Sequence, residues 1–116
     1  MTQWERARRE FESCVAERPS EYEPTTVAVM NDILELLQRT GRPAPNIWPG
    51  YWPAFCVDWD LPGVENLKLE VFADRIEVYR YNETLFDVWD EDHDPGNAFS
   101  EAFLNELPSP DVTLLK

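Results

Sequence analysis

The sequence predicts an α+β fold: an antiparallel sheet of three to four strands with helices packed on one face, in the order α-α-β-β-β-β-α. Apolar residues recur every three or four positions before residue 40 and again near the C-terminal end, which is helical spacing. Between residues 55 and 81 they alternate with polar residues, which is strand spacing. A chain of 116 residues with 43% hydrophobic residues can fill one modest core, so we expect a single domain over 1–116. Its expected parts are a helical part (1–41), a proline- and tryptophan-rich connector (42–53), a meander sheet with a C-terminal helix (54–107) and a tail (108–116).

Three helices are expected. The first covers residues 3–17 and carries an apolar stripe, with charged residues on its other side. The second follows an N-cap at Thr25 or Thr26 and ends at Arg39, since a glycine and a proline come soon after. The third covers residues 99–107 and ends where a proline follows.

The connector, RPAPNIWPGYWP, contains four prolines, so its backbone is expected to be extended or turning rather than helical. Its aromatic residues Trp48, Tyr51 and Trp52 allow two interpretations. We favour the one in which they fold back over an edge of the core, because a large exposed apolar patch is rare on a soluble monomer. If they are exposed instead, they are the strongest apolar contacts for a partner protein.

Three strands are expected within residues 55–59, 67–72 and 76–81, and a fourth runs from Leu85 to Trp89. A two-residue turn at positions 73 and 74 and a loop over 61–65 fix the register of the first three. The expected opposite pairs are Val71 with Ile76, Glu70 with Glu77, Lys68 with Tyr79, Asp58 with Lys68, and Cys56 with Glu70.

Two of these pairs bear on function. Asp58 opposite Lys68 is favourable, whereas Glu70 opposite Glu77 places like charges together at a cost of about 0.2–1 kcal/mol. The simpler interpretation is that Arg75 or another basic side chain screens the two glutamates. The alternative is that the sequence uses the paired carboxylates for binding.

The charge of the chain is strongly negative and unevenly distributed. It has 23 acidic and 10 basic residues, a formal net charge of -13. Residues 1–42 hold 8 acids and 6 bases, whereas residues 43–116 hold 15 acids and 4 bases. Phosphate contacts need clustered Lys and Arg, so direct nucleic-acid binding is not expected. The negative field belongs to the sheet half, where it either aids solubility or imitates a phosphate backbone.

Several other functions are disfavoured. Cys14 and Cys56 are far apart and are expected to be small buried hydrophobes, not a disulfide or a zinc site. The only histidine, His93, lies among acids that favour its protonated form, which is a poor general base. No glycine-rich phosphate loop is present. No run of about 18–20 apolar residues and no secretory signal occurs, so we expect a cytoplasmic protein with no membrane association.

A calcium site is considered and set aside. Asp90, Asp92 and Asp94 have the 1, 3, 5 spacing of an EF-hand loop, and Glu101 falls at position 12. However, position 6 requires the sharp turn of a glycine and is Pro95, and the preceding segment is predicted to be a strand. We therefore expect no metal and no cofactor.

The chain is similar, at the level of class, to other proteins. The stretch PAFCVDWDLPGVENLKLEVFADRIEVYRY resembles a hairpin pattern of small uncharacterised bacterial and phage proteins. A short acidic domain without a catalytic constellation is similar to phage-encoded inhibitors of host defence, anti-CRISPR proteins among them, and to immunity proteins and antitoxins. No motif matches residue by residue, so no functional residue is carried over from any family.

These observations predict a non-enzymatic inhibitor or adaptor that binds a protein with a basic surface, such as the nucleic-acid groove of a defence or DNA-processing complex. The alternatives are an immunity protein or antitoxin that neutralises a basic toxin and, third, a small carboxylate-dependent hydrolase. The oligomeric state is left open. The expected electrostatic contacts are Asp58, Asp60, Glu70, Glu77, Asp90, Asp92 and Asp94. The expected apolar contacts are Trp48, Tyr51 and Trp52.

Overall fold

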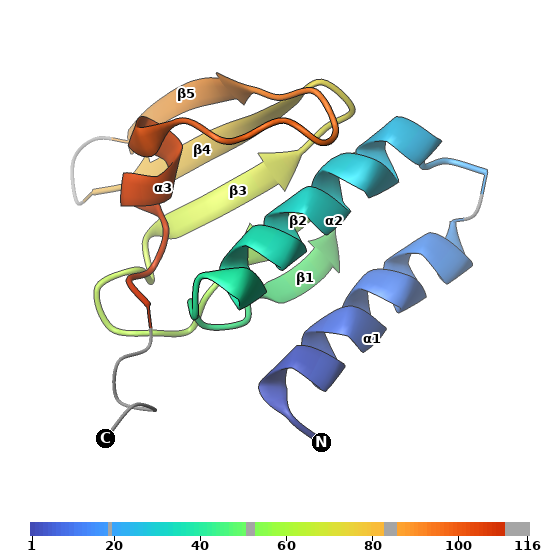
Figure 1. The fold of residues 1–116 in the computed structure, drawn as a ribbon, viewed down its shortest axis with the longest axis horizontal. Coiled ribbons are helices and arrows are strands. Elements are labelled where there is room, and N and C mark those ends of the chain that lie inside the picture. The colour runs from blue at the N-terminus through green and yellow to red at the C-terminus, as the bar shows by residue number, and fades with distance from the viewer. Residues whose placement is uncertain (19, 51–52, 83–85, 111–116) are drawn as a thin grey trace.

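The computed structural model describes residues 1–18, 20–50, 53–82 and 86–110. Two helices come first, and a five-stranded sheet and a short helix follow (Figure 1). The helices are α1 (Gln3–Glu17), α2 (Pro24–Arg39) and α3 (Glu101–Glu106). The strands are β1 (Asn46–Pro49), β2 (Phe55–Asp58), β3 (Leu67–Val71), β4 (Arg75–Tyr81) and β5 (Phe86–Asp92). Neighbouring strands are antiparallel and lie in the order β1-β2-β3-β4-β5. The α+β prediction is confirmed, with one strand more than expected.

The two long helices begin in different ways. At the start of α1, the hydroxyl of Thr2 accepts the backbone N–H of Glu5, and the Glu5 carboxylate accepts the N–H of Thr2. This capping box satisfies two N–H groups that have no partner within the helix. The predicted N-cap of α2 at Thr25 or Thr26 is wrong. The helix starts at Pro24, whose fixed φ suits a first helical position, and Thr26 is buried in the core.

The additional strand, β1, lies in the connector and pairs with β2. The connector was expected to be extended. A strand forms despite its prolines because backbone N–H groups point alternately toward and away from the neighbouring strand, and the prolines take positions that point away. The N–H of Gly50 bonds to the carbonyl of Ala54, so positions 46, 48 and 50 face β2. Pro45 and Pro49 occupy the alternate positions, which face away from β2, so their missing N–H groups remove no hydrogen bond between the two strands.

The predicted register of the central strands is confirmed in all five pairs. The turn after β3 is closed by a bond of 2.9 Å from the N–H of Phe72 to the carbonyl of Arg75, which leaves the two expected turn residues between them. Because this turn is short, the alternation of β3 determines that of β4, and every aliphatic side chain in the pair falls on the inner face.

The last strand differs from its prediction. It was expected from Leu85 to Trp89, whereas β5 continues to Asp92; Leu85 lies outside the described residues. The acidic tract is therefore largely strand rather than loop. The strand can extend this far for two reasons. Strand β4 continues to Arg75, which pairs with Asp92, and β5 lies at the edge of the sheet, where charged side chains can remain in water.

The core lies between the inner face of the sheet and the helices, with α2 crossing in front of the sheet (Figure 1). The ring of Phe55 stacks on Tyr22, with centroids 4.1 Å apart, and meets Phe11 edge to face at 5.3 Å. The indole N–H of Trp59 donates to the carbonyl of Pro43 at 3.0 Å. Helix α3 is shorter than the predicted 99–107, since it begins after an N-cap at Ser100.

Both cysteines are buried and free, as predicted. Burial raises the pKa of each thiol, and that of Cys56 reaches about 11. Within the described part of the chain, no helix combines the length and the apolar character needed to cross a membrane.

Candidate functional site

The candidate site is the outer face of the sheet, the side turned away from the core. Side chains alternate along each strand, so strand parity assigns every second residue to this face. The residues of this face whose side chains the structure describes are Asn46, Trp48, Cys56, Asp58, Lys68, Glu70, Arg75, Glu77, Tyr79, Tyr81, Val88, Asp90 and Asp92. Five of these residues are acidic and two are basic, which gives the face a formal charge of -3.

A row of three carboxylates crosses strands β3, β4 and β5 on this face. Glu70 is opposite Glu77, and Glu77 is opposite Asp90. The Arg75 guanidinium lies 3.1 Å from the Glu77 carboxylate, and the Lys68 ammonium lies 3.6 Å from Glu70. The prediction that a basic side chain screens the two glutamates therefore agrees with the geometry. Only Asp90, at the end of the row, has no hydrogen bond or ion pair with another described side chain.

Tyr79 adds a further contact to this row. Its hydroxyl donates to the Glu77 carboxylate at 2.7 Å. This hydrogen bond, together with partial burial, raises the pKa of Tyr79 well above its ordinary value of 10.0. Glu77 thus receives bonds from two neighbours, Arg75 and Tyr79, which hold its carboxylate in place on this surface.

The second row carries the predicted pair of Asp58 and Lys68, which are opposite each other as expected. The structure nevertheless gives Asp58 other partners. Its Oδ1 accepts from the side-chain amide of Asn46 at 3.1 Å and from the indole N–H of Trp48 at 3.4 Å. Asp60, just beyond β2, accepts from the same Asn46 amide at 3.1 Å. Lys68 pairs along its own strand with Glu70, because the carboxylate two residues away is within its reach.

The acids of β5 are the least engaged of the predicted contacts. Asp90 and Asp92 are exposed on the outer face, and Asp87 is exposed on the other side of the same strand. Among the described residues, none of these three side chains has a hydrogen bond or ion pair. Asp94 lies beyond the strand in an exposed loop, so it continues the acidic line without belonging to the outer face.

The outer face also exposes apolar surface that the sequence analysis largely missed. Trp48 is 51% exposed, Val88 50% and Tyr81 46%. The favoured prediction that Trp48 folds back over the core is therefore wrong, and the alternative, an exposed apolar contact, agrees with its exposure; Val88 and Tyr81 were not predicted contacts. The alternation of side chains along β4 places Tyr81 on the outer face, and a longer β5 paired with β4 would place Val88 there too, so the sequence could have indicated both. Tyr51 and Trp52, the other predicted apolar contacts, lie outside the described residues.

The remaining polar side chains of the acidic tract are buried and structural. Glu91 accepts the N–H and the hydroxyl of Ser100, both at 2.7 Å, and so ties β5 to the start of α3. His93 is buried, and its Nε2 lies 2.8 Å from Asp32 of α2. Asp32 also accepts the N–H of Gly96, so this contact fastens the segment after β5 to α2.

The geometry offers the calcium interpretation no support. The described residues contain no group of three or more histidine, cysteine, aspartate or glutamate side chains arranged to hold a metal ion. Asp90 and Asp92 point from a strand, and an EF-hand loop would have to wrap its ligands around one point.

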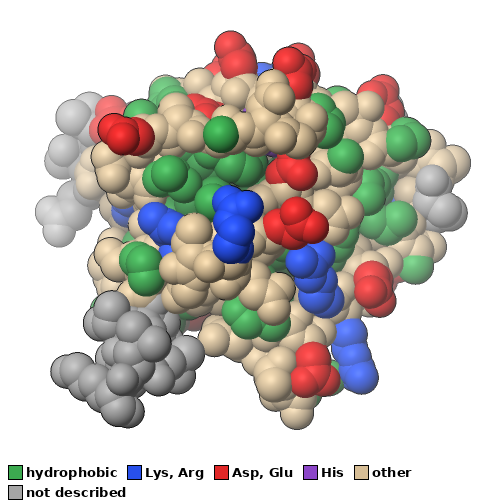
Figure 2. Space-filling view, viewed as in Figure 1, with side chains coloured by type: hydrophobic (Ala, Val, Ile, Leu, Met, Phe, Trp, Pro, Cys, Tyr) green, Lys and Arg blue, Asp and Glu red, His purple; other side chains and the backbone are tan. Residues whose placement is uncertain are grey.

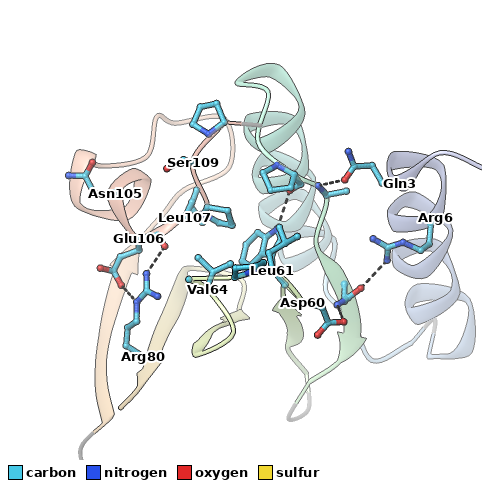
Figure 3. A pocket seen from close by; sticks show the side chains of 18 residues that line it. Gln3, Arg6, Asp60, Leu61, Val64, Arg80, Asn105, Glu106, Leu107 and Ser109 are labelled. Atoms are coloured by element: carbon cyan, nitrogen blue, oxygen red, sulfur yellow. Dashed lines mark hydrogen bonds and ion pairs between the residues drawn. The ribbon is translucent and has the colours of Figure 1, made fainter. Parts of the chain in front are cut away.

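A pocket of about 850 Å³ lies at one end of the sheet, between the start of α1, the β2–β3 loop and α3 (Figure 3). Of the predicted site residues it includes only Asp60. Glu106 lies on the opposite side of the pocket, where Arg80 holds it at 3.5 Å (Figure 3). Arg6 is likewise engaged, with the carboxylate of Glu10 at 2.9 Å. Among the described residues that line it, the pocket thus does not bring together two free carboxylates.

Figure 2 shows acidic side chains along the upper margin of the view, where Figure 1 places β5 and the segment after it. The fold and the site together define an α+β protein with an acidic sheet face that exposes several apolar side chains. Comparison of the chain with protein-family models, with curated proteins and with solved structures finds no match.

Proposed function

We propose that the chain is a non-enzymatic inhibitor or adaptor that binds a basic surface of another protein through the outer face of its sheet. The observation that carries the proposal is the gathering of Glu70, Glu77, Asp90 and Asp92 on one face together with exposed apolar side chains. Protein interfaces combine complementary charge, which guides encounter, with apolar groups that gain from desolvation. This face offers both.

Charge density bears on the kind of partner. Opposite residues on neighbouring strands lie about 4.5–5.5 Å apart, so the row from Glu70 to Asp90 places three carboxylates within about 10 Å. Duplex DNA presents about six charges over the same length. The unpaired acids of β5 increase the density at one side, whereas Lys68 and Arg75 reduce it in the middle. A nucleic-acid-binding groove is thus one suitable partner surface, and we propose the broader class of basic protein patches.

Binding is a better match to the site than hydrolysis. A carboxylate-dependent hydrolase requires two carboxyl groups facing one substrate position. In the pocket of Figure 3, Glu106 is held by Arg80, and the acids of the outer face lie elsewhere. An immunity protein or antitoxin would use the same surface, and the identity of the partner separates that role from inhibition of a defence complex.

The test compares two variants of equal charge as baits for affinity capture from a host lysate. One is Glu70→Gln/Asp90→Asn/Asp92→Asn on the outer face. The other is a control on the helices, Glu12→Gln/Glu17→Gln/Glu35→Gln, at exposed positions. The partner should be retained by the wild-type chain and by the helix control and lost with the outer-face variant.

The association rate of the captured protein is then measured at about 0.05 M and about 0.3 M salt. We expect the outer-face variant to slow association about tenfold at the lower salt, and high salt to remove most of the difference. Salt-insensitive binding, or an equal effect of both variants, would contradict the proposal and direct attention to the connector around Trp48.

A further inference from the structure

The two edges of the sheet differ in their free backbone groups. At the β1 edge, positions 45, 47 and 49 face away from β2. Pro45 and Pro49 have no N–H, and the N–H of Ile47 donates to the carboxylate of Glu10 on α1 at 3.0 Å. The Arg6 guanidinium donates to the carbonyl of Pro45 at 3.3 Å. Helix α1 and the prolines therefore close this edge to any further strand.

The β5 edge is open. The N–H of His93 donates to the carbonyl of Asp74 at 3.0 Å, which fixes the parity of the β4–β5 ladder. The backbone groups of Val88, Asp90 and Asp92 consequently point away from β4. No strand in the described part of the chain pairs with them, and their N–H groups have no partner there. In Figure 1, β5 forms the upper border of the sheet, and α2 and α3 lie in front of its inner face.

The negative charge of the β5 edge favours a basic partner over a second copy of the chain. Asp87, Asp90 and Asp92 are exposed, and residues 82–110 contain no lysine or arginine. A second copy of the chain would bring the same acids against them, and like charges on adjacent strands are destabilising. A segment with basic residues would instead be attracted to them. Val88, half exposed on the outer face, offers an apolar contact beside the acids.

We propose that β5 pairs with an extended basic segment of the partner protein, which adds as a sixth strand to the sheet. This inference rests on the proposed function and specifies how the partner is recognised. The sheet is antiparallel throughout, and antiparallel pairing is the more stable kind. From its N-terminal end, the added strand therefore has a basic residue opposite Asp92, a second basic residue opposite Asp90 and an apolar residue opposite Val88. Any residue can occupy the two positions between them.

The probe is the peptide acetyl-TRTRTVT-amide, seven residues long to match β5. Its threonines favour extended structure, and its arginines and valine follow the expected order. Two further peptides of equal charge carry three N-methyl groups each. In one they are on the arginines and the valine, whose N–H groups face β5 in the proposed pairing. In the other they are on three threonines, whose N–H groups face solvent.

Binding is followed by NMR on the isotopically labelled chain at low salt. We expect the parent peptide to slow amide exchange of Val88, Asp90 and Asp92. The threonine-methylated peptide should bind as well as the parent, and the arginine- and valine-methylated peptide about tenfold more weakly, since its bonds to β5 are blocked. The variant Asp90→Asn/Asp92→Asn should bind the parent peptide more weakly than the helix variant Glu12→Gln/Glu17→Gln.

Three outcomes would overturn the inference. Equal binding of the two methylated peptides would mean that charge alone holds them, which removes the sixth strand but leaves the proposed function intact. Absence of binding at low salt would refute recognition of a basic segment by β5. Self-association of the chain with amide protection at β5 would make a second copy the occupant of the edge.

Discussion

Raising the pH should destabilise the protein through one buried thiol of strand β2. Cys56 is 8% exposed, and burial raises its pKa from 9.0 to about 11. The neighbouring carboxylates of Asp58 and Glu70 raise it as well, and Lys68 lowers it. Between these two pH values the unfolded chain loses the thiol proton and the folded chain keeps it. The unfolded state binds fewer protons there, so the free energy of unfolding falls as the pH rises.

The magnitude follows from the two pKa values. One unit corresponds to about 1.4 kcal/mol, so the contribution of Cys56 lost by pH 10 is about 1.4 kcal/mol, and the limit well above pH 11 is about 2.7 kcal/mol. Total stabilities of about 5–15 kcal/mol make this loss measurable.

The assay is urea unfolding of the wild-type chain and of Cys56→Ala at pH 7.5 and at pH 10. Groups that titrate in this range away from Cys56, Cys14 among them, are present in both proteins and cancel in the comparison. The wild-type chain should lose about 1.4 kcal/mol more than Cys56→Ala over this interval. An equal loss in the two proteins would show that the folded thiol titrates as it does in the unfolded chain, and the argument from burial would be refuted.

Two further predictions concern the supports of the sheet. Glu10→Ala removes the acceptor of the Ile47 N–H and should lower the free energy of unfolding by about 1–3 kcal/mol, whereas Glu12→Ala on the exposed side of α1 should change it by about 0.5 kcal/mol or less. Equal urea midpoints for these two variants would contradict the closed-edge description. Phe103→Ala empties a fully buried position of α3 and should cost about 3–5 kcal/mol, with exposed Ala102→Ser as its control. A loss below about 1 kcal/mol would show that α3 adds little to the core.

The central register could be predicted from the sequence because its causes are local. A two-residue turn after β3 and the alternation on either side leave one arrangement in which all the aliphatic side chains of β3 and β4 face inward. Strand β1 could not be predicted in this way. Proline argues against a strand until the hydrogen-bonding parity is known, and that parity depends on β2. The extent of β5 was underestimated for a related reason, since three consecutive acids (90–92) argue against a strand, and β5 accommodates them because it lies at an exposed edge of the sheet.

The sequence predicted which acids lie in the candidate site, but not which of them are paired with basic side chains. Side chains alternate between the two faces along each strand, and this alternation, visible in the sequence, places most of the predicted acids on one face. Which acids are neutralised depends on side-chain reach, and Lys68 contacts Glu70 on its own strand rather than Asp58 opposite. The contact between His93 and Asp32 joins residues 61 positions apart and has no local signal.

The closed β1 edge also limits how large an assembly can become. A sheet that accepts a neighbour on both sides can propagate from molecule to molecule and produce fibres. Here α1 and two prolines block one side, so each molecule can accept at most one strand, on the other. Complexes formed by this route should consequently end at one-to-one stoichiometry, even when the chain is abundant.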